Sequence, residues 1–167
     1  GIRSPRQFVR EGESLAVEAI VTDVDGKVVS GRTVQVTVAR VEEVFVNGAF
    51  TTREIDAQEC TIRSGAQPES CSVVAEIGGQ YKVKAIVRDD AGGRNRSELT
   101  RWVSGAQPVP TRTVERGTAT VIPDRDEYEP GATAELLVIS PFTGGHGLVA
   151  LTAHGTTTVQ AITIADG

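Results

Sequence analysis

Apolar and polar residues alternate with a period of two through most of this 167-residue chain, and no other feature constrains the fold as much. Successive side chains on a β-strand point to opposite faces, so this spacing places one apolar row against a core and one polar row against water. Valine, isoleucine and threonine, whose branched side chains fit a pleated surface, are frequent in these runs. Inward-facing rows are predicted at Leu15, Val17, Ala19 and Val21, at Val34, Val36 and Val38, and at Tyr81, Val83, Ala85 and Val87.

Short turn signals separate the alternating runs. Asp25-Gly26 follows one run and Asp89 to Gly93 follows another, and both contain residues that tolerate the positive φ of tight hairpins. Thr52 to Glu59 would tolerate a helix, but the stretch is short and uncapped, so we interpret it as strand or loop. Seven short strands with turns between them predict an all-β, antiparallel sandwich of the immunoglobulin or fibronectin III type. The strands are expected at about 6–10, 14–23, 32–41, 43–55, 57–63 with 70–77, 80–89 and 95–103.

A proline-containing segment divides the chain. Pro108 and Pro110 cannot donate to a strand ladder and favour extended backbone, which is typical of a domain junction. We therefore predict a first domain at 1–105, a linker at 106–116 and a second β unit at 117–167. Strands of the second unit are expected at 118–122, 132–139, 148–154 and 157–164.

The two halves of the chain contain a weak internal sequence repeat. Phe8 to Leu15 and Tyr128 to Ala134 each combine an aromatic residue, a turn with glycine and the start of an alternating run, which suggests two copies of one domain type. A unit of about 50 residues buries too little of its surface to be more than marginally stable when it folds alone. We therefore interpret the second copy as incomplete at its C-terminus, and we expect its open sheet edge to favour self-association or partial disorder.

Cys60 and Cys71 are the only thiols in the chain. They form no C-x-x-C motif and have no histidine nearby, so zinc binding and redox catalysis have little support. The segment between them includes Gly65 and Pro68, which suits a short hairpin-like loop closed by a disulfide. The alternative is a pair of buried free thiols in a cytosolic protein. A disulfide would indicate an oxidising compartment, either a periplasm or the cell exterior.

Composition excludes several classes of protein. The net charge of −5 and the pI near 5.1 argue against nucleic acid and anionic membranes as main partners, because both require an electropositive surface. No apolar run approaches the roughly 18 residues of a membrane-spanning helix. The first ten residues lack the apolar stretch of a signal peptide.

No motif for catalysis or for cofactor binding emerges. His146 and His154 have an even spacing that would place them on one strand face, yet no third ligand is evident, and His146 is interpreted as part of a loop tip. Asp23-x-Asp25-Gly26 begins like a calcium loop but lacks the later oxygen ligands, so a hairpin turn explains it. No G-x-S-x-G and no phosphate-binding glycine loop with its lysine occurs. We predict no catalytic, cofactor-binding or metal-binding residue, no cofactor, and no enzyme activity.

Two further features have structural interpretations. Arg88, Arg94, Arg96 and Arg101 are interleaved with acidic residues, a mixture typical of a solvated hairpin rather than of an anion site. Trp102, the only tryptophan, lies just before the predicted linker, where we expect it to pack against the neighbouring domain; ordinary core packing is the alternative.

Several segments, taken in order, resemble the macroglobulin-type domains of the bacterial alpha-2-macroglobulin family. Together they cover nearly the whole chain, and their order and spacing are more specific than any one motif. The segment from Ile122 to Gly131 resembles the entry to a domain at or shortly before the bait region of that family. The other matching segments are Ile20 to Lys27, Val29 to Gly31, Cys60 to Cys71, Gly78 to Tyr81, Arg94 to Ser97, Trp102 to Gly105 and Ala134 to Phe142.

The resemblance implies a large, multi-domain protease trap. In that family a protease cuts an exposed bait region, the molecule rearranges, and in many members a buried thioester then links covalently to the attacker. Bacterial members are typically periplasmic, and often anchored to the inner membrane by a lipid. This chain has no Cys-x-Glu-Gln thioester motif and no long irregular segment that would serve as a bait.

The resemblance therefore predicts a non-catalytic scaffold fragment of a broad-spectrum endopeptidase inhibitor, with bait and thioester regions elsewhere in the parent protein. Its expected partners are sibling domains and the proteases that the parent meets, with a periplasmic or extracellular location. The alternative is a set of immunoglobulin-like modules from a bacterial surface adhesin or receptor, which would bind a partner through their loops.

Overall fold

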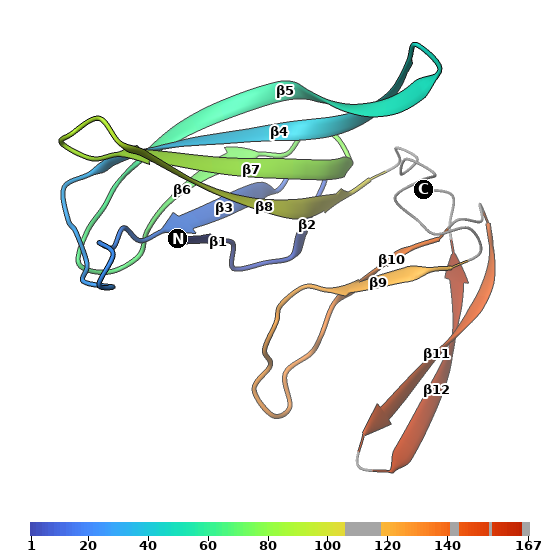
Figure 1. Cartoon of the computed structure of the whole chain (residues 1–167). Coiled ribbons are helices and arrows are strands. Elements are labelled where there is room, and N and C mark those ends of the chain that lie inside the picture. The colour runs from blue at the N-terminus through green and yellow to red at the C-terminus, as the bar shows by residue number, and fades with distance from the viewer. Residues whose placement is uncertain (106–117, 141–143, 154, 165–167) are drawn as a thin grey trace.

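The computed structural model describes residues 1–105, 118–140, 144–153 and 155–164 (Figure 1). Every regular element in these ranges is a β-strand, so the prediction of an all-β chain is confirmed. None of these residues belongs to a helix able to cross a membrane. The strands are β1 (Ile2–Arg3), β2 (Phe8–Arg10), β3 (Ser14–Ala19), β4 (Thr33–Val46), β5 (Ala49–Arg63), β6 (Glu69–Val74), β7 (Gly79–Arg88), β8 (Arg94–Ser104), β9 (Thr120–Pro123), β10 (Leu136–Ile139), β11 (Gly145–Ala153) and β12 (Thr156–Ile164).

The first eight strands form two sheets of a sandwich. One sheet has the order β1-β3-β6, and the other has the order β2-β8-β7-β4-β5. All neighbouring strands are antiparallel except β2 and β8, which run parallel. The strand predicted at 6–10 corresponds to β2 in the large sheet, and the structure adds β1, which was not predicted and which joins the small sheet. Residues 4–7 therefore cross from one sheet to the other, and the seven predicted strands become eight.

The core lies between these two sheets and comes from the predicted rows. Leu15 and Val17 on β3 are fully buried, and Val36 and Val83 from the facing sheet are buried to the same degree. Val21 and Val87, at the ends of their rows, are partly buried and pack against the same cluster. Tyr81 is buried at the start of β7, and its hydroxyl donates a hydrogen bond to the carbonyl oxygen of Ile77 at 2.8 Å. Immunoglobulin-like sandwiches often carry such a tyrosine at this corner.

The prediction of one strand over 43–55 is wrong. The chain reverses at Asn47-Gly48, where φ is 51° and 81°, and β4 and β5 pair in register up to Val46 and Ala49. Asn-Gly is the preferred sequence for a two-residue turn with positive φ at both positions, and this signal was available in the sequence. The resulting hairpin extends beyond the end of β7 (Figure 1), since β7 pairs with β4 only as far as Arg40.

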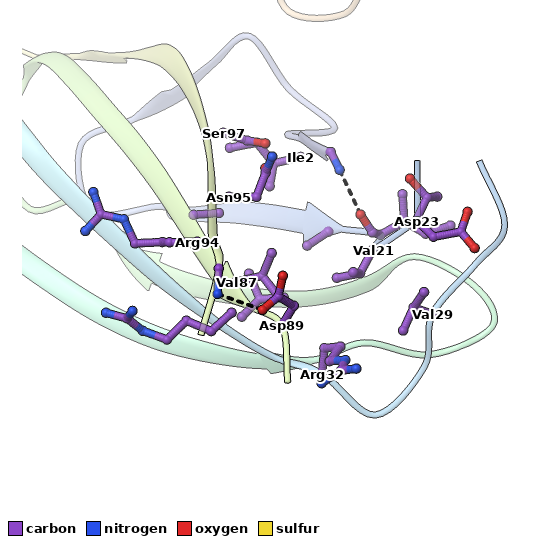
Figure 2. A pocket seen from close by; sticks show the side chains of 18 of the residues that line it. Ile2, Val21, Asp23, Val29, Arg32, Val87, Asp89, Arg94, Asn95 and Ser97 are labelled. Carbon is purple, nitrogen blue, oxygen red and sulfur yellow. Dashed lines mark hydrogen bonds between the residues drawn. The ribbon is translucent and has the colours of Figure 1, made fainter. Parts of the chain in front are cut away.

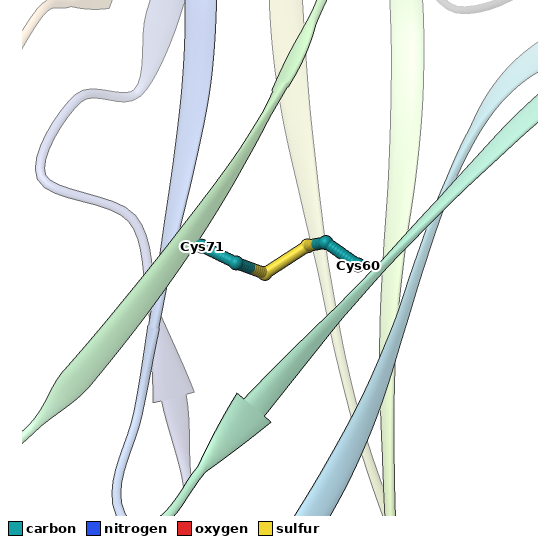
Figure 3. Close-up of a disulfide and its surroundings, with 2 residues drawn as sticks. All are labelled: Cys60 and Cys71. Carbon is teal, nitrogen blue, oxygen red and sulfur yellow. A yellow bond between two sulfur atoms is a disulfide. The ribbon is translucent and has the colours of Figure 1, made fainter.

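A disulfide joins Cys60 and Cys71, with an S–S distance of 1.98 Å and a Cα–Cα distance of 6.2 Å (Figure 3). The hairpin-like loop expected around it is wrong, because β5 and β6 do not pair. Cys60 lies on β5, an edge strand of the large sheet, and Cys71 lies on β6, an edge strand of the small sheet. The Gln58 side chain also donates to the carbonyl oxygen of Val74 across these edges at 2.8 Å. The bridge therefore fastens the two sheets together along one side of the sandwich.

The C-terminal strands form two separate antiparallel pairs. β9 pairs with β10, and β11 pairs with β12 over its full length. The strand predicted from residue 132 begins only at Leu136. The internal repeat therefore does not include a strand at Ala132 to Ala134 that would match the one after Phe8 to Leu15. The predicted linker at 106–116 lies outside the described residues, and the division into two domains stays a prediction.

Candidate functional site

The residues considered for catalysis or metal binding do not come together. His146 lies exposed on β11 opposite Thr163, and not in a loop tip as the sequence suggested. His154 lies outside the described residues. Within the described ranges, no group of three or more His, Cys, Asp or Glu side chains is placed to hold a metal ion.

Both acidic turn motifs stabilise hairpins. Asp23 Oδ1 accepts hydrogen bonds from the backbone N–H groups of Asp25 and Lys27, at 3.0 and 2.9 Å. Asp89 Oδ1 accepts from Ala91 and Gly93 in the same way, at 3.0 and 2.7 Å. The carboxylates are thus used by their own turns, as the sequence analysis expected for a turn rather than a calcium loop.

A cavity of about 830 Å³ opens at one end of the sandwich, between β1 and β3 on one side and β7 and β8 on the other (Figure 2). Its walls include the apolar side chains Ile2, Val21 and Val87, with Asn95 and Ser97 as polar groups. Arg94 extends away from Asn95 and Ser97 (Figure 2), because strand alternation places it on the outer face. The arginine-rich hairpin is exposed, as the sequence analysis expected, and only Arg101 of the four arginines is half-buried.

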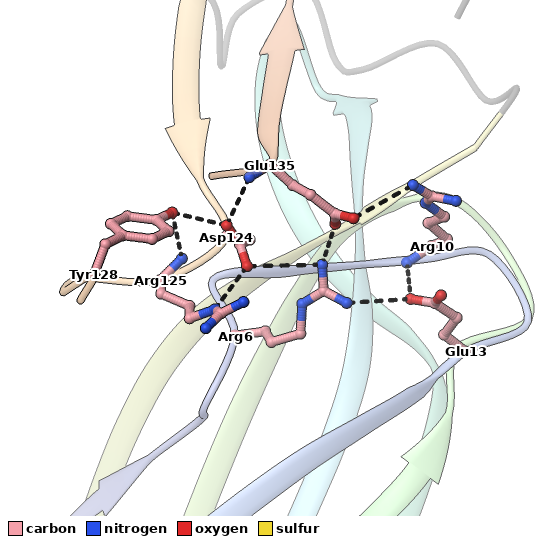
Figure 4. A network of polar contacts seen from close by, with 7 residues as sticks. All are labelled: Arg6, Arg10, Glu13, Asp124, Arg125, Tyr128 and Glu135. Carbon is pink, nitrogen blue, oxygen red and sulfur yellow. Dashed lines mark hydrogen bonds and ion pairs between the residues drawn. The ribbon is translucent and has the colours of Figure 1, made fainter. Parts of the chain in front are cut away.

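The densest polar arrangement lies where β9 and β10 meet the N-terminal sandwich. We call it the polar junction. It is centred on the crossover between β1 and β2, where the Gln7 backbone N–H donates to the Asp124 carbonyl oxygen at 2.8 Å. The Gln7 side chain donates to Asp126 Oδ1 at 2.7 Å, and the Gln7 carbonyl accepts from the Trp102 N–H at 3.2 Å. The junction consists of Arg6, Gln7, Arg10 and Glu13 from the sandwich and Asp124, Arg125, Asp126, Tyr128 and Glu135 from the C-terminal segment (Figure 4).

Asp124 organises the C-terminal side of the polar junction. It follows β9 directly, and its side chain is almost completely buried. Its Oδ1 accepts hydrogen bonds from the Tyr128 hydroxyl at 2.7 Å and from the Glu135 backbone N–H at 2.9 Å. Its Oδ2 accepts from Arg125 Nε at 3.0 Å. One carboxylate thereby joins both ends of the 124–135 loop and an aromatic residue within it.

These contacts change the acidity of Asp124. Burial is the largest single influence and raises its pKa, but the hydrogen bonds from Tyr128, from the Glu135 N–H and from Arg125, with the Arg125 charge, together outweigh it. The net result lowers the pKa of Asp124 to about 2, so the carboxylate is ionised under ordinary conditions. The pKa of Tyr128 is raised, first by burial and then by its hydrogen bond to this carboxylate.

Ion pairs connect the two sides of the polar junction. Arg6 pairs with Glu135 and lies 4.0 Å from Asp124 Oδ2 and 3.9 Å from Glu13. Arg10 lies 3.6 Å from Glu135 (Figure 4). With Asp126, which accepts from Gln7, the junction contains four carboxylates and three arginines, so it carries one excess negative charge. These contacts link the 124–135 loop to the crossover between β1 and β2.

Trp102 lies beside this arrangement. It is half-buried on β8, opposite Phe8 of β2. Strand alternation turns Phe8 away from the core, since its neighbour Val9 belongs to the core cluster. Phe8 is nevertheless only 5% exposed, and the Arg6 guanidinium lies over its ring at 5.7 Å from the centroid. Packing of Trp102 against a neighbouring domain stays a prediction.

Sequence reasoning missed the polar junction. It gave no role to Arg6, Gln7 or Asp124. The spacing of Asp124 and Tyr128 is ordinary for a loop, and contacts between residues more than 100 positions apart leave no periodic signal. Only the segment from Ile122 to Gly131, singled out for its resemblance to a family, pointed toward this region.

Comparisons with known proteins give a family context. No protein-family model matches the chain. The chain is 24% identical over 139 residues to an alpha-2-macroglobulin homolog from Nostoc sp., an alignment that covers 78% of this chain and 7% of the relative. The chain therefore corresponds to a small part of that relative's length. A solved structure of the native conformation of E. coli alpha-2-macroglobulin aligns with 95% of this chain and 11% of its own, at 18% identity and a TM-score of 0.41.

Proposed function

We propose that this chain, which resembles the bacterial alpha-2-macroglobulin family in sequence, is a non-catalytic structural module of a protease inhibitor of that type. The observation that carries the proposal is the sequence similarity to an alpha-2-macroglobulin homolog along 78% of the chain. The resemblance noted from the sequence motifs points to the same family. In this role the module positions bait and thioester regions that lie elsewhere in the protein.

The architecture supports a mechanical role. The N-terminal sandwich has a continuous core, and a disulfide fastens its two sheets along one side. The polar junction then fixes the 124–135 loop against the crossover between β1 and β2. A module of this kind transmits a change in orientation from one neighbour to the next, because its own parts resist bending. Trp102, half-buried beside the junction, is the residue we propose for contact with a sibling domain.

We propose a periplasmic or extracellular location. Cys60 and Cys71 are joined in a disulfide, and such bridges persist mainly in oxidising compartments. The proposed partners are sibling domains of the same protein and, through the complete protein, the proteases it meets.

The experiment compares the isolated chain with the protein encoded by its full reading frame. Each is incubated with several endopeptidases of different specificity, and cleavage of a large protein substrate is followed. The full-length protein should protect the substrate and be cut at one bait region, whereas the isolated chain should do neither. Failure of the full-length protein to affect any endopeptidase would overturn the protease-trap proposal. Inhibition by the isolated chain would overturn the scaffold role.

A further inference from the structure

The hairpin between β7 and β8 separates its charges onto two faces. Its sequence mixes arginines with acidic residues, an arrangement typical of a solvated hairpin. Strand alternation from Val87, which packs against the core, turns Asp89 to the inner side, where its carboxylate accepts hydrogen bonds from its own turn. Asp90 pairs with Arg32, which lines the cavity at this end. Arg94 extends in the opposite direction from Asp89 (Figure 2), so the acidic residues of the turn do not accompany the arginines to the outer face.

Arginines form a row across the outer face of the large sheet. Arg88 on β7 lies directly opposite Arg94 on β8, and Thr33 on β4 lies opposite Arg63 on β5. The β4–β7 ladder ends one step before Thr33 and Arg88, which places these two side by side. Residues opposite each other in a sheet point to the same side, and Ile62, next to Arg63, is buried in the core. The row therefore faces outward, and we call Arg63, Arg88 and Arg94 the arginine row.

The charges of the arginine row are not neutralised by the part of the chain that the structure describes. Arg63, Arg88 and Arg94 are all exposed, and among the described residues none of the three forms a hydrogen bond or an ion pair. Glu98 on β8 is engaged elsewhere, 3.3 Å from Lys82 Nζ. Like charges directly opposite each other destabilise a sheet, so the pair of Arg88 and Arg94 favours the arrival of an anion.

The hairpin register brings Arg88 and Arg94 close enough to hold one carboxylate between them. The Asp89 N–H donates to the Gly93 carbonyl oxygen at 3.0 Å, so the adjacent pair of Arg88 and Arg94 is a non-hydrogen-bonded pair. The Cα atoms of such pairs are about 4.5 Å apart, with their side chains close together. Guanidinium groups bind carboxylates through two parallel hydrogen bonds, and Arg63, about 10 Å from Arg88 across two strand spacings, is placed for a second carboxylate.

We propose that the arginine row binds an extended acidic segment of a partner polypeptide, laid across the strands. The midpoint between Arg88 and Arg94 lies about 12 Å from Arg63, at two and a half strand spacings. In an extended segment, side chains four residues apart point to the same side and are about 13 Å apart. The segment that fits therefore carries two carboxylates four residues apart, one for the pair of arginines and one for Arg63. This proposal does not depend on the function proposed above.

The surroundings of the arginine row favour a short acidic segment over a large polyanion. Glu59 and Glu98 lie on the same outer face, four residues from Arg63 and Arg94 along β5 and β8. The chain as a whole carries a net charge of −5. A nucleic acid or an anionic membrane presents its charge over a wide area and would face these carboxylates as well. A segment that crosses the strands at the row avoids them.

The experiment uses the complete chain and a fluorescent peptide, Thr-Glu-Thr-Thr-Thr-Glu-Thr, whose anisotropy reports binding at low ionic strength. Binding should be saturable and should weaken as salt is added. The isomeric peptide Thr-Glu-Thr-Thr-Glu-Thr-Thr, whose carboxylates lie on opposite sides when extended, should bind at least about threefold more weakly. Absence of binding, or equal binding of the two peptides, would overturn the proposal. Tighter binding of a single-stranded oligonucleotide or of phosphatidylglycerol vesicles would overturn it too.

Variants of the chain locate the binding. The double substitution of Arg88→Gln and Arg94→Gln should raise the dissociation constant at least about tenfold, because two bidentate donors are lost. Arg3→Gln with Arg53→Gln is the matched control, since it removes two positive charges that pair with Glu18 and Glu42 away from the row. Equal binding by the two double variants would overturn the proposal.

A charge reversal separates binding from folding. Arg94→Glu places a carboxylate opposite Arg88, so the hairpin gains a cross-strand ion pair in place of a repulsion. This variant should melt at a temperature no lower than that of the original chain and should bind the peptide at least about tenfold more weakly. Undiminished binding by a folded Arg94→Glu chain would show that the peptide does not use the arginine row.

Discussion

Asp124 shows how one buried carboxylate organises a loop and an interface together. Its two carboxylate oxygens accept three hydrogen bonds, from Arg125, Tyr128 and Glu135. These residues lie one, four and eleven positions further along the chain. Its backbone carbonyl accepts from Gln7, which belongs to the sandwich. Loss of its negative charge would therefore affect both the 124–135 loop and the contact of that loop with the crossover between β1 and β2.

Asp124→Asn should lower the free energy of unfolding by about 1–3 kcal/mol at pH 7, because a buried hydrogen-bond network loses its charged acceptor. Urea denaturation followed by circular dichroism measures the change. Glu127→Gln, at an exposed position in the same loop, is the control and should change stability by less than about 0.5 kcal/mol. Equal stability of the Asp124→Asn variant and the original chain would contradict the role of this carboxylate.

The same residue predicts a pH dependence. The pKa of Asp124 in the folded chain is about 2, below the usual value near 3.8, so the unfolded state binds more protons between these values. The stabilising contribution is therefore complete above about pH 4 and is lost as pH falls toward 2. The difference in unfolding free energy between the original chain and Asp124→Asn should shrink over this window. A difference that stays constant from pH 6 to pH 2 would show that the charge of Asp124 is not responsible.

Among the strands, the β4–β5 hairpin depends on a two-residue turn. Gly48 has φ of 81°, and a Cβ added there would meet no atom within 4 Å, so any cost of substitution is conformational. Gly48→Ala should lower the free energy of unfolding by about 1 kcal/mol, because an L-residue with a side chain disfavours positive φ. Gly48→Asn should lower it less, since asparagine tolerates this conformation. Thermal unfolding compares the variants, and equal losses for alanine and asparagine would contradict the explanation.

The disulfide acts on the edges of the two sheets. β5 and β6 do not pair with each other, so the disulfide between Cys60 and Cys71 adds a second covalent link to the backbone connection through residues 64–68. Reduction should lower the free energy of unfolding by about 3 kcal/mol, from the chain-entropy cost of closing a loop of this length. Calorimetry with and without reductant measures the change. A double variant with serine at both positions should be insensitive to reductant, and an unchanged melting temperature of the original chain would contradict the role of the bridge.

In the whole molecule, the polar junction connects β9 and β10 to the sandwich. The double substitution of Arg6→Ala and Gln7→Ala removes the ion pair with Glu135 and the side-chain hydrogen bond to Asp126. Amides of residues 118–140 should then exchange hydrogen faster, while those of β4 and β7 stay protected, because the core between the sheets is untouched. Mass spectrometry of proteolytic peptides resolves the two regions.

Arg3→Ala is the control for that substitution, since Arg3 pairs with Glu18 within the sandwich. This variant should leave exchange in residues 118–140 unchanged. If the double variant also leaves those residues unchanged, the junction does not couple the two parts of the chain.

The sequence alone determined the fold class and the core of this protein. Alternation with a period of two is a local property, and burial follows from it directly, as the rows at Leu15, Val34 and Tyr81 show. The Asn47-Gly48 turn was equally local, and its signal was overlooked. Only the tertiary structure decided which strands are neighbours, that the disulfide joins two sheets, and that Gln7 meets Asp124. Those contacts join residues far apart in the chain, and their energies depend on geometry that no short segment of sequence encodes.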